Sequence, residues 1–334
     1  MPLVIPVFIP HEGCPHCCVF CNQRRISGYT EPPVSGSDVK EIVQTWLERD
    51  NNTSRQVQVA FYGGSFTGLA RKRQEELLTA VAPFIEQGRV ATLRLSTRPD
   101  YIDRPTIAFL RRHHVGIVEL GVQSLADEVL TASARGHSPA DVVKAMDLLH
   151  ESAMEIGIQL MVGLPGESRR NIRQTVAGVI ALRPDFVRIY PVLVVKNSPL
   201  AKMYAAGKYQ PLSLEKAVLM AAWMKNRFDT AAINVVRMGL QAGPELENSL
   251  IAGPWHPAFG ELVQARLMFR RVRSLLSSAG SGQRIKIAIS PRDESVFRGM
   301  KSANMKRLKE LHLADSFTLV FDPGQPRNTV IRLP

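Results

Sequence analysis

The sequence predicts an α/β fold: an open or closed barrel of parallel strands covered by helices, followed by a small α/β extension. Short apolar runs rich in β-branched residues alternate with amphipathic helical segments through the first 240 residues. The strand runs are almost continuously apolar, as in parallel sheets that helices cover. Glycine-rich or polar motifs follow the strands, which places a functional site at their carboxyl ends.

Six strands and the helices between them make up residues 1–240. We predict strands at 3–10, 57–62, 91–97, 116–123, 155–162 and 186–192. Helices are predicted over 37–49 and 74–85, where apolar residues recur every 3.6 positions. A third begins after Ser138-Pro139, a capping serine followed by a first-turn proline.

Residues 241–334 change character and predict a separate extension. Gly243-Pro244 and Gly253-Pro254 interrupt the alternation. A helix is expected over 257–276, with short strands at 285–289, 316–321 and 329–333. We therefore expect one domain over 1–240 and a basic extension over 241–334.

Composition describes an ordinary globular chain. With 45% apolar and 22% charged residues it can bury a large core, and no apolar run reaches the roughly 18–20 residues that cross a bilayer. The opening run, LVIPVFIP, has two prolines and no preceding basic region, so we interpret it as a strand and not a signal peptide. Thiols that bind metal must stay reduced, which predicts a cytoplasmic protein without a membrane span.

All four cysteines lie in one short loop after the first strand, at Cys14, Cys17, Cys18 and Cys21. They are too close together to join distant parts of a fold, and a disulfide between neighbours would be strained. Such a cluster, in a chain otherwise without cysteine, predicts a metal or an iron–sulfur cluster.

The spacing of these cysteines separates the candidate metals. Cys14, Cys18 and Cys21 form C-x3-C-x2-C, and Cys17 falls outside this pattern. A structural zinc site usually has a second ligand pair, and no such pair follows; Cys17 could complete a four-thiolate zinc site, so zinc stays the alternative. Three thiolates on a four-iron cluster leave one iron open to a substrate or cofactor.

The C-x3-C-x2-C spacing, with Phe20 directly before the last cysteine, resembles the signature of the radical S-adenosylmethionine (SAM) superfamily. The resemblance implies a partial (β/α)6 barrel, a 4Fe–4S cluster on Cys14, Cys18 and Cys21, and a cluster loop over 11–28. In that family the reduced cluster cleaves SAM to a 5′-deoxyadenosyl radical, which takes a hydrogen atom from the substrate. It also implies an electron donor such as flavodoxin or ferredoxin.

Motifs at the strand ends extend this resemblance over most of residues 1–240. S-T-R-P-D, E-L-G-V-Q-S, A-R-G-H and M-V-G-L-P-G-E are similar to the branch that contains oxygen-independent coproporphyrinogen oxidases and the catalytic subunit of Elongator. R-I-Y-P-V-L-V-V at 188–195 resembles the Elongator subunit more closely. We expect no acetyltransferase domain after the barrel.

The resemblance also implies which residues contact the cofactor. Gly63-Gly64-Ser65 resembles the second-strand motif that meets the methionyl amine, where a missing Cβ lets the ligand approach. Gln123 and Arg135 are implied to contact the ribose or carboxylate of SAM. The implied cofactor set is Phe20, Gly63, Gly64, Ser65, Thr97, Gln123, Arg135 and Gln159. Gln159 stands where the porphyrinogen oxidases carry an acidic residue, and Cys17, where relatives carry a basic one, is taken as a non-ligand.

Positive charge is concentrated in the extension. The chain has a net charge of +12, and residues 266–310 contain twelve Lys or Arg against three acidic residues. This segment is either a solvated basic face or a surface that follows RNA phosphates. The resemblance to an enzyme that acts on transfer RNA favours tRNA as the partner. A radical enzyme acting on a small molecule such as a tetrapyrrole, or a non-enzymatic haem-chaperone-like protein, are the alternatives.

Residues 253–261 could reach the mouth of the barrel, where His256 and Glu261 would handle a proton during turnover. The alternative is a proline-rich turn that only packs Trp255 and Phe259.

Overall fold

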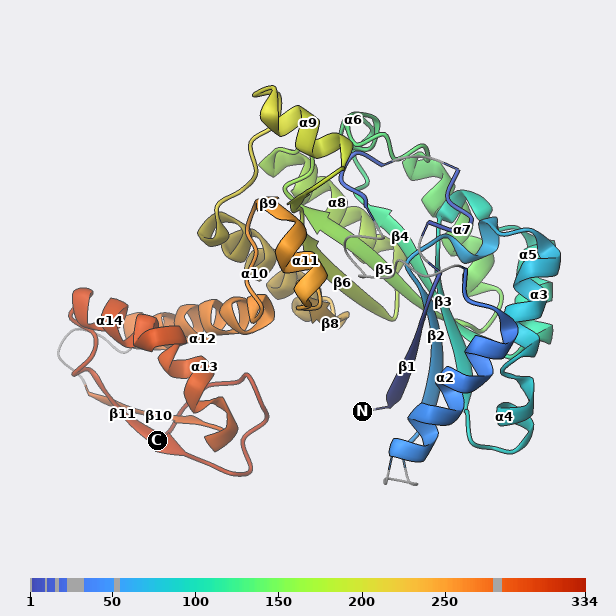
Figure 1. Cartoon of the computed structure of the whole chain (residues 1–334). Coiled ribbons are helices and arrows are strands. Elements are labelled where there is room, and N and C mark those ends of the chain that lie inside the picture. The colour runs from blue at the N-terminus through green and yellow to red at the C-terminus, as the bar shows by residue number, and fades with distance from the viewer. Residues whose placement is uncertain (1, 10, 16–17, 23–32, 51–54, 279–283) are drawn as a thin grey trace.

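The computed structural model describes residues 2–9, 11–15, 18–22, 33–50, 55–278 and 284–334. Seven parallel strands form the main sheet, in the order β1-β2-β3-β4-β5-β6-β8 (Figure 1). They are β1 (Leu3–Phe8), β2 (Val57–Tyr62), β3 (Thr92–Thr97), β4 (Val115–Gln123), β5 (Glu155–Val162), β6 (Phe186–Pro191) and β8 (Asn234–Met238). In this order β1 and β8 lie at opposite edges, so the sheet is an open half-barrel. The predicted α/β fold is confirmed.

Helices connect successive strands of this sheet. They are α2 (Gly36–Arg49), α3 (Arg71–Thr79), α4 (Ala82–Glu86), α5 (Arg104–Arg112), α6 (Asp127–Ala132), α7 (Pro139–His150), α8 (Arg169–Leu182), α9 (Pro199–Ala205) and α10 (Leu214–Thr230). Ser35, Ser138 and Ser168 each form a capping box at the start of a helix. The helix predicted over 74–85 is two helices instead. Pro83 lacks an N–H, and its ring would clash with the carbonyl of residue 79, where α3 ends.

The main core lies between the sheet and these helices. Every strand from β1 to β6 contributes fully buried side chains, among them Ile5, Val59, Leu95, Leu120 and Ile158. β8 was not among the six predicted strands. It is an edge strand whose residues are exposed or half-buried, so it lacks the continuous apolar run that identified the others.

Residues beyond β8 form a smaller unit. First, α11 (Pro244–Ser249) leads into β9 (Leu250–Ala252), which pairs antiparallel with β7 (Val194–Val195) from the segment between β6 and β8. Then α12 (Phe259–Ser278) leads away from the barrel (Figure 1). The extension then contains β10 (Ile285–Ile289), α13 (Glu294–Arg298), α14 (Ala303–Glu310), β11 (Phe317–Phe321) and β12 (Ile331–Arg332). Its sheet has the order β11-β10-β12, with β11 parallel and β12 antiparallel to β10.

The extension has its own core, which includes Met268, Ile287, Phe297 and Phe317. The first half of α12 belongs to the main core through Val263 and Leu267. The division at residue 240 stays a prediction, because α12 contributes to both cores. Among the helices of the described residues, none has both the length and the apolar character that a bilayer span requires.

Candidate functional site

The cysteine loop follows β1 and lies at the carboxyl end of the sheet. Cys18 is buried and Cys21 is half-buried, and the Cys21 N–H donates to the Cys18 carbonyl at 3.0 Å. The Cys14 side chain is exposed; desolvation by the surrounding protein raises the pKa of its thiol, while the positive charges of Arg135 and Arg98 act to lower it. Cys17 and residues 23–28 of the loop lie outside the described residues. Within the described part of the chain, no three His, Cys, Asp or Glu side chains are arranged to hold a metal ion, so the ligand set stays a prediction.

The glycine motif after β2 supports the backbone of this loop. A Cβ on Gly64 would overlap the carbonyl oxygen of Glu12 and lie 2.5 Å from that of Ile9. The Ser65 N–H donates to the Glu12 carbonyl at 3.0 Å. A ligand was the expected neighbour of Gly64, whereas the neighbours that the structure shows are the cluster loop itself.

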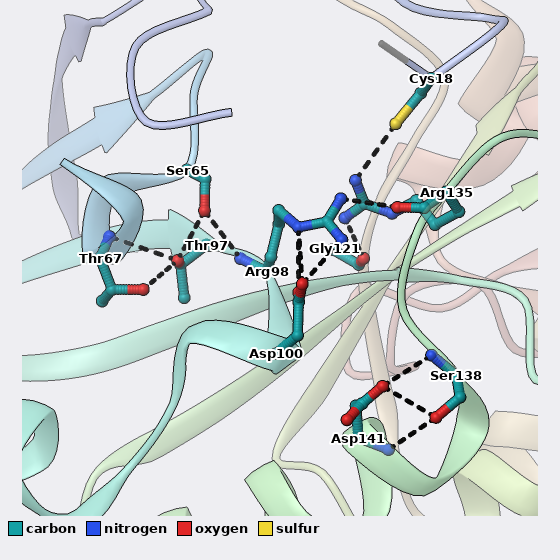
Figure 2. A network of polar contacts seen from close by, with 10 residues as sticks. All are labelled: Cys18, Ser65, Thr67, Thr97, Arg98, Asp100, Gly121, Arg135, Ser138 and Asp141. Atoms are coloured by element: carbon teal, nitrogen blue, oxygen red, sulfur yellow. Dashed lines mark hydrogen bonds and ion pairs between the residues drawn. The ribbon is translucent and has the colours of Figure 1, made fainter. Parts of the chain in front are cut away.

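Ser65 and Thr97 are brought together in a buried chain of hydroxyl groups (Figure 2). The Thr97 Oγ1 lies 3.1 Å from Ser65 Oγ and 2.6 Å from Thr67 Oγ1, and it accepts from the Thr67 N–H at 3.3 Å. A hydroxyl offers one donor and two acceptor positions, so these three contacts fill the capacity of Thr97. Thr97 therefore joins the ends of β2 and β3, and contacting a cofactor through its hydroxyl would require one of these bonds to be exchanged.

Arg135 connects the cysteine loop to the end of β4. Its Nη1 donates to the Cys18 sulfur at 3.4 Å, and its Nη2 donates to the Gly121 carbonyl (Figure 2). Arg98, almost fully buried, donates to the Arg135 carbonyl at 2.7 Å and forms an ion pair with Asp100 at 2.9 Å. The backbone of Arg135 is thus held by Arg98, which directly follows β3.

Two buried polar atoms near Gly121 have no protein partner among the described residues: Gln123 Oε1 and Arg135 Nε. A Cβ on Gly121 would lie 2.8 Å from Arg135 Nη2 and 3.2 Å from Gln123 Nε2, so both side chains converge over this glycine. Gln123 also has φ +69°, a conformation that costs a non-glycine residue energy. Buried polar groups are normally paired, so an unpaired donor and acceptor at one point fit a polar ligand such as SAM.

Gln159 belongs to a second group of side chains, on the inside of the half-barrel. Its amide Nε2 lies 3.2 Å from Ser96 Oγ and 3.3 Å from Glu119 Oε2. Glu119 is fully buried and forms ion pairs with Arg94 at 2.5 Å and Arg188 at 2.7 Å. The hydrogen bonds described for Gln159 therefore direct its amide to this ion cluster and away from Arg135.

Sequence analysis missed the ion cluster of Glu119, Arg94 and Arg188. The signal that would have found it is a charged residue inside each of three otherwise apolar strand runs, since a buried charge requires a partner. Tyr62 donates to Glu119 at 3.3 Å, and burial, followed by the nearby Glu119 charge, raises the pKa of its hydroxyl to about 12.

Two further residues of the site rim were also missed. The Glu167 carboxylate accepts from the Gly163 N–H at 2.6 Å, and burial raises its pKa to about 7 against the effect of that bond. The Tyr209 hydroxyl donates to the Gly163 carbonyl at 2.7 Å. Both fix the loop after β5. Phe20, implied as a cofactor contact, packs on the small apolar cluster that includes Val129 and Leu164.

Residues 253–261 pack their aromatic side chains as the packing alternative expected, and a proton-handling role for His256 and Glu261 stays a prediction. His256 Nδ1 accepts from the Ala258 N–H at 3.0 Å, and Glu261 is exposed in the first turn of α12. Trp255 packs on the cluster of Leu193, Val195 and Leu246, and Phe259 is buried in the main core.

The basic residues of 266–310 divide into those with partners inside the protein and those facing solvent. Arg271 donates to the Asn328 carbonyl and lies 3.8 Å from Asp229, so it attaches the extension to α10. Arg266 and Arg307 both approach the ring face of Phe269, at 5.6 and 5.3 Å. The exposed basic residues without a described ion pair are Arg270, Arg273, Arg284, Lys286, Arg292, Lys301, Lys306, Arg307 and Lys309.

An open parallel half-barrel with a cysteine loop at its carboxyl end is the arrangement expected of a radical SAM protein. Comparison with known families confirms this class. Residues 8–177 match the family described as the radical SAM superfamily, and residues 184–268 match the Radical_SAM C-terminal domain. The first match covers more than half of the chain. The chain belongs to the radical SAM superfamily and is a radical SAM enzyme.

Several relatives share the Elongator-like character expected from the motifs. The tRNA uridine(34) acetyltransferase of Methanocaldococcus jannaschii is 26% identical over 67% of this chain and 48% of its own length. Human Elongator complex protein 3 is 28% identical over 39% of this chain and 24% of its own length. The chain thus spans about half the length of the archaeal acetyltransferase that it matches.

Solved structures agree on the fold. The archaeal Elp3 of Methanocaldococcus infernus, with an N-terminal deletion, superposes with a TM-score of 0.63 at 22% identity, covering 80% of this chain and 63% of that one. Coproporphyrinogen III oxidase (HemN) from Escherichia coli gives 0.50 at 17% identity, covering 69% and 53%. At these identities both comparisons establish the fold alone.

Proposed function

We propose that this chain cleaves SAM at a 4Fe–4S cluster held by Cys14, Cys18 and Cys21, and that the resulting chemistry modifies a nucleoside of tRNA. The observation that carries the first part is the convergence of Arg135 and Gln123 over Gly121, beside Cys18, with one buried donor and one buried acceptor unpaired. Relatives named tRNA uridine(34) acetyltransferase support the second part.

When bound, the reduced cluster and SAM supply a radical that removes a hydrogen atom from the substrate. Cys14, Cys18 and Cys21 would hold the cluster through three thiolates, which would leave one iron open to SAM. Arg135 donates to the Cys18 sulfur and so joins this ligand to the end of β4. Arg135 would offer its Nε–H and Gln123 its Oε1 to the carboxylate or ribose of SAM. The resemblance of Gly63-Gly64-Ser65 to the family motif is what assigns these glycines to the amine. Arg98 and Thr97 position these groups without needing to contact the cofactor.

The substrate RNA is recognised mainly through its phosphates. The exposed basic side chains of 266–310 give the extension a localised positive charge, which supplies affinity for RNA regardless of sequence. Electrons come from a small donor protein such as flavodoxin or ferredoxin. Thiols that hold a cluster must stay reduced, and the compartment proposed for the protein is therefore the cytoplasm.

A small anionic molecule such as a tetrapyrrole is the second candidate substrate. Arg94 and Arg188 both form ion pairs with the one buried carboxylate of Glu119 inside the half-barrel, so two guanidinium groups share one ion-pair partner there. An anionic group would give them a second partner.

Two measurements test the proposed function. Anaerobically reconstituted and reduced protein should convert SAM to 5′-deoxyadenosine, detected by chromatography. A strain that lacks the gene should lose one modified nucleoside from its tRNA, seen by mass spectrometry and restored by the wild-type gene but not by Cys18→Ala. Tight haem binding without SAM cleavage would instead support a haem chaperone. SAM cleavage with an unchanged tRNA nucleoside profile would favour the small-molecule substrate.

A further inference from the structure

The extension contains two helices joined by a four-residue turn and placed between two parallel strands. The chain runs from β10 through α13, the turn Gly299-Met300-Lys301-Ser302 and α14 to β11, which pairs with β10 (Figure 1). Phe297 of α13 and Leu308 of α14 are buried in the same core as Ile287 of β10 and Phe317 of β11. Both helices therefore pack on the sheet through these residues, and the turn between them is held at one end of the unit.

The backbone of this turn is strained and fixed. Gly299, Lys301 and Ser302 have φ values of +70°, +52° and +58°. For Lys301 and Ser302 this left-handed conformation costs about 1–2 kcal/mol each, and such strain persists only where the surroundings impose it. The buried Asn304 holds the residues on either side of the turn, because the two N–H groups of its Nδ2 are shared among the carbonyls of Val296, Phe297 and Ala265 at 2.9–3.2 Å.

The outer surface of the turn is exposed and basic. Met300 is 47% exposed, and Lys301 beside it faces solvent. The next exposed positions, Ala303, Lys306 and Arg307, are three and four residues apart and so lie on one face of α14. A small residue directly after the turn, with basic residues one helical turn further, leaves room for a chain of phosphates to approach the backbone.

We infer that the turn Gly299–Ser302 is the clamp of a binding site for single-stranded RNA; this rests on the proposed RNA substrate and specifies how it is held. KH modules clamp the backbone of about four nucleotides with a G-x-x-G loop. Here the first position is glycine, and Ser302, at the fourth, adopts the conformation that glycine favours. Lys301 and Lys306 neutralise phosphates of the clamped strand. Because the clamp fits one strand, the ligand is an unpaired segment of the RNA and not a duplex.

The test measures binding of the full-length protein to a short fluorescein-labelled single-stranded RNA, to the matching DNA, and to the same RNA annealed to its complement. The test variant is Met300→Asp/Lys301→Asp, which places two negative charges in the turn. The matched control, Val143→Asp/Lys144→Asp, makes the same change in charge on α7, outside the extension, where both residues are also exposed. Circular-dichroism melts establish that both variants are folded.

We expect the wild type to bind the single-stranded RNA more tightly than the duplex or the DNA. The turn variant should lose at least about tenfold in affinity, as expected for one charge-assisted contact, and the control should change less than about threefold. Equal affinities of the turn variant and the control would overturn the clamp and leave the RNA substrate standing. Equal binding of single strand and duplex, or of RNA and DNA, would also overturn the clamp. Absence of any RNA binding by the wild type would overturn both proposals.

Discussion

The guanidinium of Arg135 lies 3.4 Å from the sulfur of Cys18 and also bonds the carbonyl of Gly121, although 117 positions separate Arg135 from Cys18. One side chain thus joins the cysteine loop, which follows the first strand, to the end of the fourth. The backbone carbonyl of Arg135 accepts a hydrogen bond from Arg98, which follows the third strand. These contacts between protein groups hold Arg135 in position without a ligand.

Replacing Cys14, Cys18 or Cys21 with alanine should each abolish the cluster, because three thiolates are the fewest that hold four irons with one site open. Cys17→Ala should retain it. Iron and sulfide analysis after anaerobic reconstitution, together with visible absorbance, measures the outcome. Loss of the cluster in Cys17→Ala with retention in one of the other three variants would disprove the ligand assignment.

Arg135→Gln should weaken SAM binding by about ten- to hundredfold, because a hydrogen bond from a charged group contributes roughly 1.5–3 kcal/mol. Equilibrium binding of SAM to the reconstituted, unreduced protein measures this loss. Arg104→Gln is the control, since Arg104 is an exposed arginine whose ion pair with Glu151 lies on the helix surface. Unchanged SAM affinity in Arg135→Gln would restrict Arg135 to supporting the loop.

Gly64→Ala should release the cysteine loop and reduce the iron that the protein retains. The added methyl group would meet two backbone carbonyl oxygens, Glu12 and Ile9, and neither can rotate away as a side chain could. Gly243→Ala, with no atom within 4 Å of its new Cβ, is the control. If Gly64→Ala keeps its iron and loses only SAM affinity, the glycine serves the ligand, as the sequence motif implied.

Stability should fall as pH rises from about 4.5 to 7, in part through Glu167. Burial raises its pKa from the ordinary value of 4.5 to about 7, so in this range the folded protein holds a proton that the unfolded chain has released. The free energy of unfolding then decreases by about 3 kcal/mol over the interval. Urea titrations at several pH values should show a flatter profile for Glu167→Gln than for wild type or the exposed control Glu261→Gln. If Glu167→Gln and the wild type have identical profiles, the Glu167 carboxyl group is already ionised in the folded protein over this pH range.

Arg270→Glu/Arg273→Glu should weaken RNA binding and make its salt dependence shallower by about 0.7–0.9 per lost phosphate contact. The two residues are exposed and three positions apart on α12, so they share a face. Arg271 is left unchanged because it bonds Asn328 within the protein. The control is Arg49→Glu/Arg112→Glu, which makes an equal change in charge. These two residues lie at the carboxyl ends of α2 and α5, at the end of the sheet opposite the cysteine loop. Unchanged affinity and salt slope would make this part of the extension a solvated surface.

Much of the fold could be predicted because it depends on local patterns. The strands predicted at 57–62, 155–162 and 285–289 have the same bounds in the structure. Each is an apolar run, and the residues on either side of it in the sequence mark where the strand begins and ends. α13 and α14 were missed because each is short, so neither shows a helical repeat long enough to recognise.

The sequence by itself determined the superfamily, the parallel α/β sheet and the cysteine loop, because strand periodicity and cysteine spacing are properties of neighbouring residues. Only the tertiary structure decided which polar groups meet: Arg135 with Cys18, Gln159 with Glu119, and Ser65 with Thr97. It also showed that Gly64 lies against the loop backbone and that Ser302 takes a glycine-like conformation. These contacts depend on distances between residues that are far apart in the chain, and the Ser302 conformation depends on its surroundings in the fold. Local sequence patterns reveal neither the distances nor the conformation.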